Sequence, residues 1–191
     1  MRYNDTSYHL HRMLAVIGAG GLMGVVVSAS HALAAFEQLD AFDNKTSRLR
    51  RQRLIAELRR QDLIVETHES EGLRLQLSVK GIHRLQRMEI GQLDIATPNA
   101  WDGHWHMVVF DIPASHKNER YVFTSLLKRL GFVMIRQSTW YHPYPCSEVV
   151  DQVVRYCNLS RFVTMAEVVR LDSSTQRTLL RRYAHLILPS P

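Results

Sequence analysis

The chain has 191 residues, of which 46% are hydrophobic and 22% are charged. This composition excludes an intrinsically disordered chain, and the length suits one or two folded domains. The two cysteines do not form a disulfide framework and indicate a reducing, cytoplasmic compartment. The formal net charge is +6, and the segment KTSRLRRQRLIAELRR at residues 45–60 contains seven Lys or Arg against one acid. A basic excess confined to one short segment is typical of a nucleic-acid partner.

Residues 13–36 carry no charged side chain over 24 positions, a length that could span a bilayer. Gly18, Gly20, Gly21 and Gly24 dilute the segment, as do two serines and a histidine. We therefore expect a buried helix, a break near the glycines and a second helix, with membrane insertion as the less favoured alternative. A membrane-anchored regulator remains the third functional hypothesis for the chain.

The next elements are predicted by hydrophobic periodicity. Residues 45–61 indicate a helix with Ser47 as its N-cap and with Leu54, Ile55 and Leu58 on one face. Residues 63–68 and 73–79 read as two strands around a turn at 69–72, which predicts a hairpin.

Ser78 is expected to cap the helix that follows, with an apolar side formed by Ile82, Leu85 and Met88. Helix, basic helix, hairpin and helix follow one another in the order of a winged helix-turn-helix. We assign residues 1–89 to this DNA-binding domain and residues 90–100 to a linker.

The second half of the chain alternates strands and helices in the order βαββαβ. The predicted strands are residues 106–112, 132–137, 139–142 and 162–171, and the predicted helices are residues 115–130 and 147–158. The first of these helices has an expected apolar face and a stop signal at Gly131; the face is Val122, Phe123, Leu126, Leu127 and Leu130. This order predicts a ferredoxin-like domain at residues 101–172, followed by a C-terminal helix and tail at 173–191. The fold class is α+β.

The motifs WDGHWHMVVFDIP (101–113), LGF (130–132) and QSTWYHPYPC (137–146) carry a family resemblance. They resemble the central domain of the PaaX-type transcriptional repressors, which is itself similar to the small CRISPR spacer-acquisition nuclease subunit. The resemblance extends over roughly residues 45–172, because the preceding winged helix is similar to the N-terminal domain of the same repressors. It implies a repressor of the short form that lacks the third, C-terminal domain. The sequence does not identify a small-molecule effector.

The basic helix supplies the candidate DNA-binding residues, which are Arg48, Arg50, Gln52, Arg53 and Arg60. The planar fork of an arginine can bind guanine O6 and N7 together, and a glutamine can bind adenine. The alternative is a solvated charged face, but such faces usually mix charges of both signs. We therefore favour duplex DNA as the partner.

Asp111 follows the first strand of the second half and has two interpretations. The nuclease resemblance implies a metal role, in which two copies of Asp111 across a dimer axis bind Mg²⁺, with Ser138 as the nominated polar helper. The structural interpretation, which we favour, is that the carboxylate accepts backbone N–H bonds in the turn before the helix. We expect no cofactor and no catalytic residue, and Asp111 is the weak candidate for both a metal site and catalysis.

Other side chains are expected to be structural. Trp105 and Trp140 are predicted to pack in the core, and Cys146 and Cys157 to be buried thiols. The pair His104 and His106 is expected to face solvent, because no third or fourth metal ligand is evident.

The sequence therefore predicts a cytoplasmic DNA-binding repressor that acts as a homodimer and is not an enzyme. The alternative is a CRISPR adaptation component, either a Mg²⁺-dependent endonuclease or a bridging subunit for the integrase.

Overall fold

The computed structural model describes residues 5–22, 44–69 and 72–187. The chain forms two compact units, residues 1–91 and 92–191, and each is described here by itself. Both units combine helices with antiparallel strands, so the fold class is α+β as predicted.

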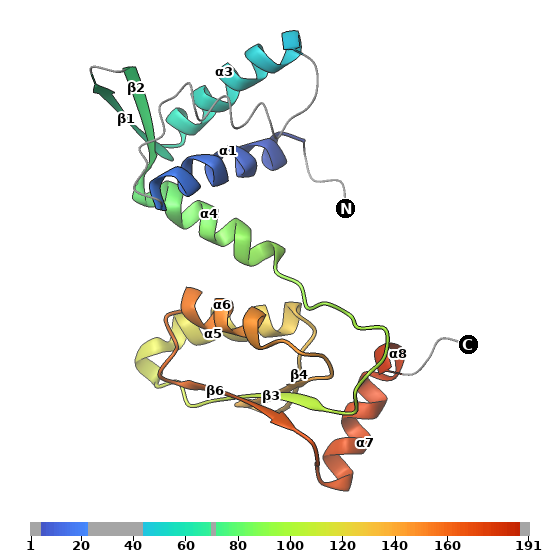
Figure 1. The fold of residues 1–191 in the computed structure, drawn as a ribbon. Helices are drawn as coiled ribbons and strands as arrows, with labels where there is room; N and C mark the ends of the chain where they lie inside the picture. The colour runs from blue at the N-terminus through green and yellow to red at the C-terminus, as the bar shows by residue number, and fades with distance from the viewer. Residues whose placement is uncertain (1–4, 23–43, 70–71, 188–191) are drawn as a thin grey trace. The chain divides into compact units, whose positions relative to one another are not determined.

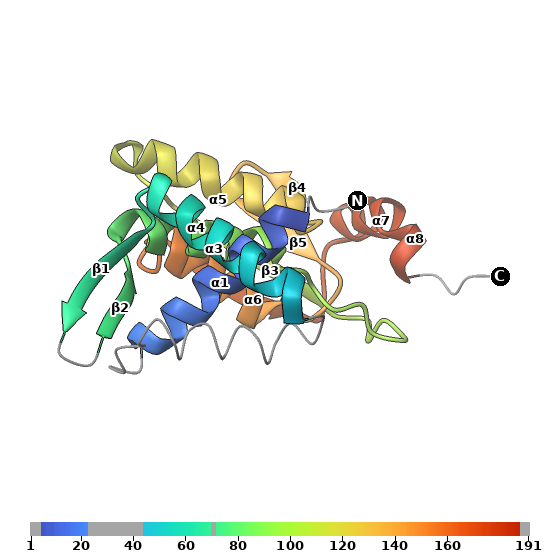
Figure 2. The same cartoon turned by 90° about the horizontal axis from the view of Figure 1, so that it is seen from above.

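The N-terminal unit contains three helices and one hairpin in its described part: α1 (Asp5–Leu22), α3 (Asn44–Arg60), β1 (Ile64–Glu69), β2 (Gly72–Leu77) and α4 (Val79–Gln92). Figures 1 and 2 show α1 and α3 side by side, with the hairpin at one end of them. Their apolar faces share one core, which includes Leu14 and Ile17 of α1, Leu54 and Leu58 of α3, and Leu75 of β2.

Helix α1 continues without interruption through Gly18, Gly20 and Gly21. The predicted break at these glycines is therefore wrong; the segment beyond Leu22, with Gly24 and the predicted second helix, lies outside the described residues. In the part of the chain that the structure describes, no helix is both long and apolar enough to cross a membrane.

Helix α3 buries Leu54 and Leu58 with Ile55 partly covered, as its periodicity predicts. Its start differs from the prediction, because the helix begins at Asn44 and places Ser47 inside it. At the other end, Asp62 takes a left-handed conformation with φ of 54°. The N–H groups of Asp62 and Leu63 then bond the carbonyls of Arg59 and Leu58, which ends the helix in a Schellman motif.

Helix α4 starts at the predicted cap. The Ser78 hydroxyl accepts the N–H of Gly81 at 3.0 Å and donates to the carbonyl of Asp62 at 2.6 Å. The buried line of the helix contains Gly81 and Leu85, whereas Ile82 is exposed. The predicted burial of Ile82 is wrong because α4 approaches the backbone of Leu63 so closely that only the glycine can face it.

The C-terminal unit contains a four-stranded antiparallel sheet in the order β4-β5-β3-β6. The strands are β3 (Trp105–Phe110), β4 (Val133–Arg136), β5 (Thr139–His142) and β6 (Val163–Val168). A 3₁₀ turn η1 (Ala114–His116) and helix α5 (Lys117–Arg129) follow β3, and α6 (Ser147–Tyr156) follows β5. The chain ends in α7 (Ser173–Arg182) and α8 (Ala184–Ile187). The predicted βαββαβ order is therefore present.

Helices α5 and α6 cover one face of this sheet (Figure 1). Val108 and Phe110 of β3 and Trp140 of β5 pack there against Phe123 of α5 and Val150 of α6. The prediction that Val122 belongs to the apolar face of α5 is wrong, because 39% of its surface is exposed.

Helix α7 packs on part of the opposite face of the sheet. Because side chains alternate along a strand, Trp105 lies on this face with Tyr141, and both contact Leu179 and Tyr183. The C-terminal helix predicted within residues 173–191 is divided at Tyr183, which is the C-cap of α7.

The Tyr183 hydroxyl fastens α7 to the sheet. It accepts the N–H of Val133 at 2.9 Å and lies 2.8 Å from the Gly131 carbonyl and 2.5 Å from the Tyr141 carbonyl, either of which can accept its proton. Burial raises the pKa of this hydroxyl, so it stays protonated.

We expect Tyr183→Phe to destabilise the C-terminal unit by about 2 kcal/mol, because the Val133 N–H would lose its partner inside the protein. Urea unfolding followed by tryptophan fluorescence measures this, since all three tryptophans (Trp101, Trp105 and Trp140) lie in this unit. Tyr121→Phe is the control, because Tyr121 is 74% exposed. Equal stability of the two variants would contradict a fastening role for Tyr183.

Candidate nucleic-acid interface and the Asp111 pocket

The candidate DNA-binding residues all lie on α3. Gln52 and Arg53 are exposed, and Arg53 forms no ion pair with any residue that the structure describes. Arg48 and Arg50 belong to the same helix, but their side chains lie outside the described residues. Arg53 is therefore the described cation of α3 that is free to meet a phosphate or a base.

The arginines at the end of α3 are engaged differently. Arg60 forms a two-point contact with Glu57, with its Nε 2.9 Å and its Nη2 2.5 Å from the two carboxylate oxygens. Hydrogen bonds from Arg60 and Gln61 lower the pKa of Glu57 to about 2. Arg59 binds Glu66 of β1 at 2.6 Å and so ties the helix to the hairpin. Sequence reasoning missed both pairs, although the i, i+3 spacing of Glu57 and Arg60 was a readable signal.

Asp111 directly follows β3 and is held by its backbone. The Phe110 N–H donates to the Ser138 carbonyl at 3.1 Å, and the Asp111 N–H donates to the Phe162 carbonyl at 2.9 Å. These two bonds join the end of β3 to the β4–β5 turn on one side and to the segment before β6 on the other. The sequence thus brings Asp111 and Ser138 together as predicted.

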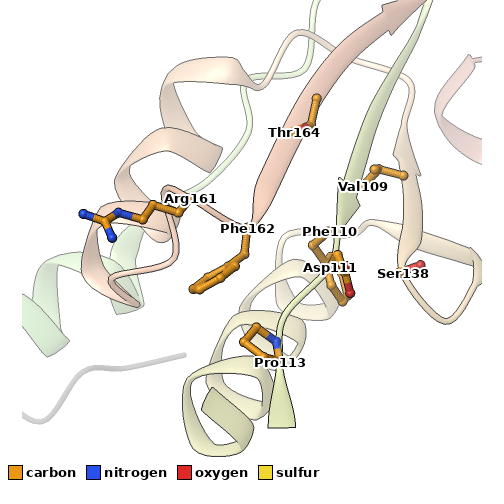
Figure 3. Close-up of a pocket in the computed structure, with 8 residues that line it drawn as sticks. All are labelled: Val109, Phe110, Asp111, Pro113, Ser138, Arg161, Phe162 and Thr164. Atoms are coloured by element: carbon orange, nitrogen blue, oxygen red, sulfur yellow. The ribbon is translucent and has the colours of Figure 1, made fainter. Parts of the chain in front are cut away.

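The residues around Asp111 line an open pocket of about 650 Å³ that includes Ser138, Thr164 and Arg161. Figure 3 shows Asp111 and Ser138 at the ends of neighbouring segments, while the guanidinium of Arg161 points away from both. Arg161 was missed by the sequence reasoning, since a single arginine in a loop carries no motif.

The Asp111 carboxylate is exposed and accepts no hydrogen bond from the part of the chain that the structure describes. The predicted role as the acceptor that organises the turn is therefore wrong. The backbone does this work instead, through the His116 N–H and the Pro113 carbonyl at 3.0 Å. Among the described residues, no group of three or more His, Cys, Asp or Glu side chains is placed to hold a metal ion.

The remaining candidates are structural with one exception. Trp105, Trp140, Cys146 and Cys157 are buried as predicted, and burial raises the pKa of the two thiols to about 12 and about 11. The histidine pair does not simply face solvent.

His104 contacts Glu167 at 2.5 Å. The Nε2 atom of His106 is buried without a hydrogen-bond partner within the described part of the chain. The prediction that both histidines face solvent is therefore wrong, because neighbouring β6 covers the end of β3 and supplies Glu167 opposite His106.

Comparison with models of protein families finds a match in the C-terminal unit. Residues 98–180 match the family model of the PaaX protein central Cas2-like domain. The matched range runs from before β3 into α7 and contains both Asp111 and Ser138. No match was found among curated proteins. Residues 98–180 are therefore similar to the central Cas2-like domain of PaaX proteins, which supports the expected PaaX-like family.

Proposed function

We propose that the protein is a transcriptional repressor of the PaaX type that binds duplex DNA as a homodimer in the cytoplasm. The N-terminal unit would act as a winged helix-turn-helix, with α3 in the major groove and the β1–β2 hairpin as the wing. The order α3, β1, β2, α4 and the common core of α1, α3 and the hairpin support this reading.

The observation that carries the proposal is the exposed face of α3. It presents Gln52 and Arg53 to solvent, on a helix whose buried side is fixed by Leu54 and Leu58. Because Arg53 has no ion-pair partner among the described residues, it can bind phosphate or the guanine edge without first breaking such a pair. The excess of cations over acids in this segment supports an anionic partner.

For the C-terminal unit we propose a ferredoxin-like domain that dimerises. The strand order β4-β5-β3-β6 supports the ferredoxin-like topology. A two-fold axis through this unit would present two α3 helices to an inverted repeat. Repression would follow from occupation of a promoter, with no cofactor required.

Arg53→Ala is expected to weaken DNA binding more than tenfold, because it removes from the proposed interface a cation that pairs with none of the described acids. Arg60→Ala is the matched comparison on the same helix and should weaken binding less than threefold, because Glu57 already holds that guanidinium. Fluorescence anisotropy on one duplex at fixed salt measures both. Unchanged affinity for Arg53→Ala would show that α3 does not form the interface with DNA.

A metal-dependent nuclease is the second candidate function, and one observation favours it. The Asp111 carboxylate is exposed beside Ser138 in an open pocket of a Cas2-like domain. A metal site would need further carboxylates, which a second copy of the chain could supply across a dimer axis. The repressor is the better supported proposal, because it accounts for the exposed cations of α3 as well.

A further inference from the structure

A second group of positively charged side chains lies in the C-terminal unit, on α7. Residues 170–182 contain four arginines and one aspartate. Arg177, Arg181 and Arg182 are all exposed on α7, and we call them the α7 arginine cluster. By contrast, α6 mixes Glu148 and Asp151 with Arg155.

The aspartate in this segment does not neutralise the cluster. Asp172 is the N-cap of α7, and its Oδ1 accepts the N–H groups of Ser174 at 3.0 Å and Thr175 at 2.9 Å. Hydrogen bonds from Ser174, whose hydroxyl also donates to Oδ1, and from Thr175 lower its pKa, so the carboxylate stays ionised and turned onto the helix end. Neither Arg181 nor Arg182 forms an ion pair with a residue in the described ranges.

The helix dipole accounts for only part of this arrangement. Cations in the last turn of a helix are favourable, which suits Arg181 and Arg182. Arg177 lies in the middle of α7, where it repels Arg181 four residues further on, and Arg170 precedes the N-terminus, where a cation opposes the dipole. Self-repulsion among these arginines, which form no ion pair with a described acid, is relieved when a polyanion binds.

The α7 arginine cluster also lies on a helix that is held firmly against the sheet. The buried side of α7 is fixed by Leu179, which is fully buried, and by the Tyr183 hydroxyl bonds to the sheet. Arg177 is further oriented by a bond from its Nε to the Ser173 carbonyl at 3.0 Å, which does not use its terminal nitrogens. A preorganised set of cations loses little entropy on binding.

We propose that the α7 arginine cluster binds the phosphate backbone of duplex DNA, as a second contact surface in addition to α3. This rests on the proposed function for the choice of DNA as the polyanion. Phosphate contacts position a protein on DNA without reading its sequence. The cluster should therefore contribute affinity and salt dependence but no specificity.

The test compares two triple variants of the full chain that have the same net charge. One is Arg177→Gln, Arg181→Gln and Arg182→Gln. The control is Lys117→Gln, Lys128→Gln and Arg155→Gln, which removes three exposed cations of α5 and α6. Each is measured by anisotropy on specific and scrambled duplexes across a salt series. Thermal unfolding and sedimentation are measured alongside, to verify the fold and the oligomeric state.

The α7 variant should bind both duplexes at least tenfold more weakly, with the ratio between them retained. The slope of log K against log salt should fall by about two to three, at about 0.9 for each phosphate contact. The control should keep nearly the wild-type slope.

Equal slopes for the wild type and the α7 variant would overturn the inference while leaving the proposed function intact if Arg53→Ala still weakens binding. Equal losses in the two triple variants would overturn it as well, since net charge alone would then explain the effect. No DNA binding by the wild-type protein would overturn both proposals.

Discussion

Gly81→Ala is expected to unfold or severely weaken the N-terminal unit, with a loss of at least about 3 kcal/mol of its stability. A Cβ atom at residue 81 would lie 2.0 Å from the carbonyl oxygen of Leu63 and 3.0 Å from the carbonyl carbon. The obstacle is backbone and cannot rotate away, and the same carbonyl accepts the N–H of Ser78 at 3.0 Å. Relief of the clash would therefore separate the start of α4 from Leu63 and break this bond.

Gly91→Ala is the matched control in the same helix, because a Cβ there meets nothing within 4 Å. It should leave stability unchanged or raise it by up to about 1 kcal/mol through helix propensity. Far-UV circular dichroism follows both units, whereas tryptophan fluorescence reports the C-terminal unit alone. Gly81→Ala should lose part of the dichroism signal with little change in fluorescence. Wild-type stability in this variant would show that α4 does not approach Leu63 so closely.

The second large effect is a loss of stability in the C-terminal unit on acidification. His142 is 4% exposed, and burial lowers its pKa from 6.5 to about 4. Its Nδ1 accepts the N–H of Tyr144 at 3.1 Å, a bond that exists only in the form without a proton on Nδ1. Rings of Phe132, Tyr144 and Tyr183 lie around it, with centroids 5.1 to 5.9 Å away.

Because the folded pKa of His142 lies below the unfolded value, the unfolded state binds more protons between about pH 6.5 and 4. The contribution of neutral His142 to the stability of the folded state is therefore fully present above pH 6.5 and is lost as the pH decreases to 4. The expected loss from this residue is about 3 kcal/mol.

Urea titrations read by tryptophan fluorescence at several pH values measure this dependence. His142→Phe should remove the slope between pH 6.5 and 4, whatever its stability at pH 7. His185→Gln should retain the slope, because His185 is exposed on α8. A wild-type profile that stays flat down to pH 4 would contradict the burial of a neutral His142.

The elements could be predicted from the sequence wherever the apolar spacing is strict. Leu54 and Leu58 of α3 were predicted to lie on one face and are buried, because their period matches a helix that is covered on one side. Gly131 was assigned correctly as a helix stop, and it adopts φ of 87°.

The errors occur where tertiary contacts decide between neighbouring positions. Ile82 is one residue away from the true contact line, which passes through Gly81 because the Leu63 backbone is so near. Val122 was predicted to lie on the same apolar face as Phe123 and Leu127, yet only the latter two of these three are buried. Hydropathy alone cannot fix the rotation of a helix by one residue when both neighbours are apolar or small.

The candidate sites also combine features that the sequence predicts with features that depend on tertiary contacts. The basic character of α3 and the neighbourhood of Asp111 and Ser138 could be predicted from local sequence and strand order. The pairing of Arg59 with Glu66 and the fastening of α7 by Tyr183 could not, because each joins segments whose contact depends on the finished fold.

Sequence-specific DNA binding by this protein is tested most directly by one measurement. The purified full chain is titrated, by fluorescence anisotropy across a salt series, onto the DNA upstream of its own gene and onto a scrambled duplex of equal length. A repressor should bind the upstream DNA at least about a hundredfold more tightly, with a steep salt dependence on both duplexes. Equal and weak binding to the two duplexes would contradict the account, because only the nonspecific electrostatic attraction would then remain.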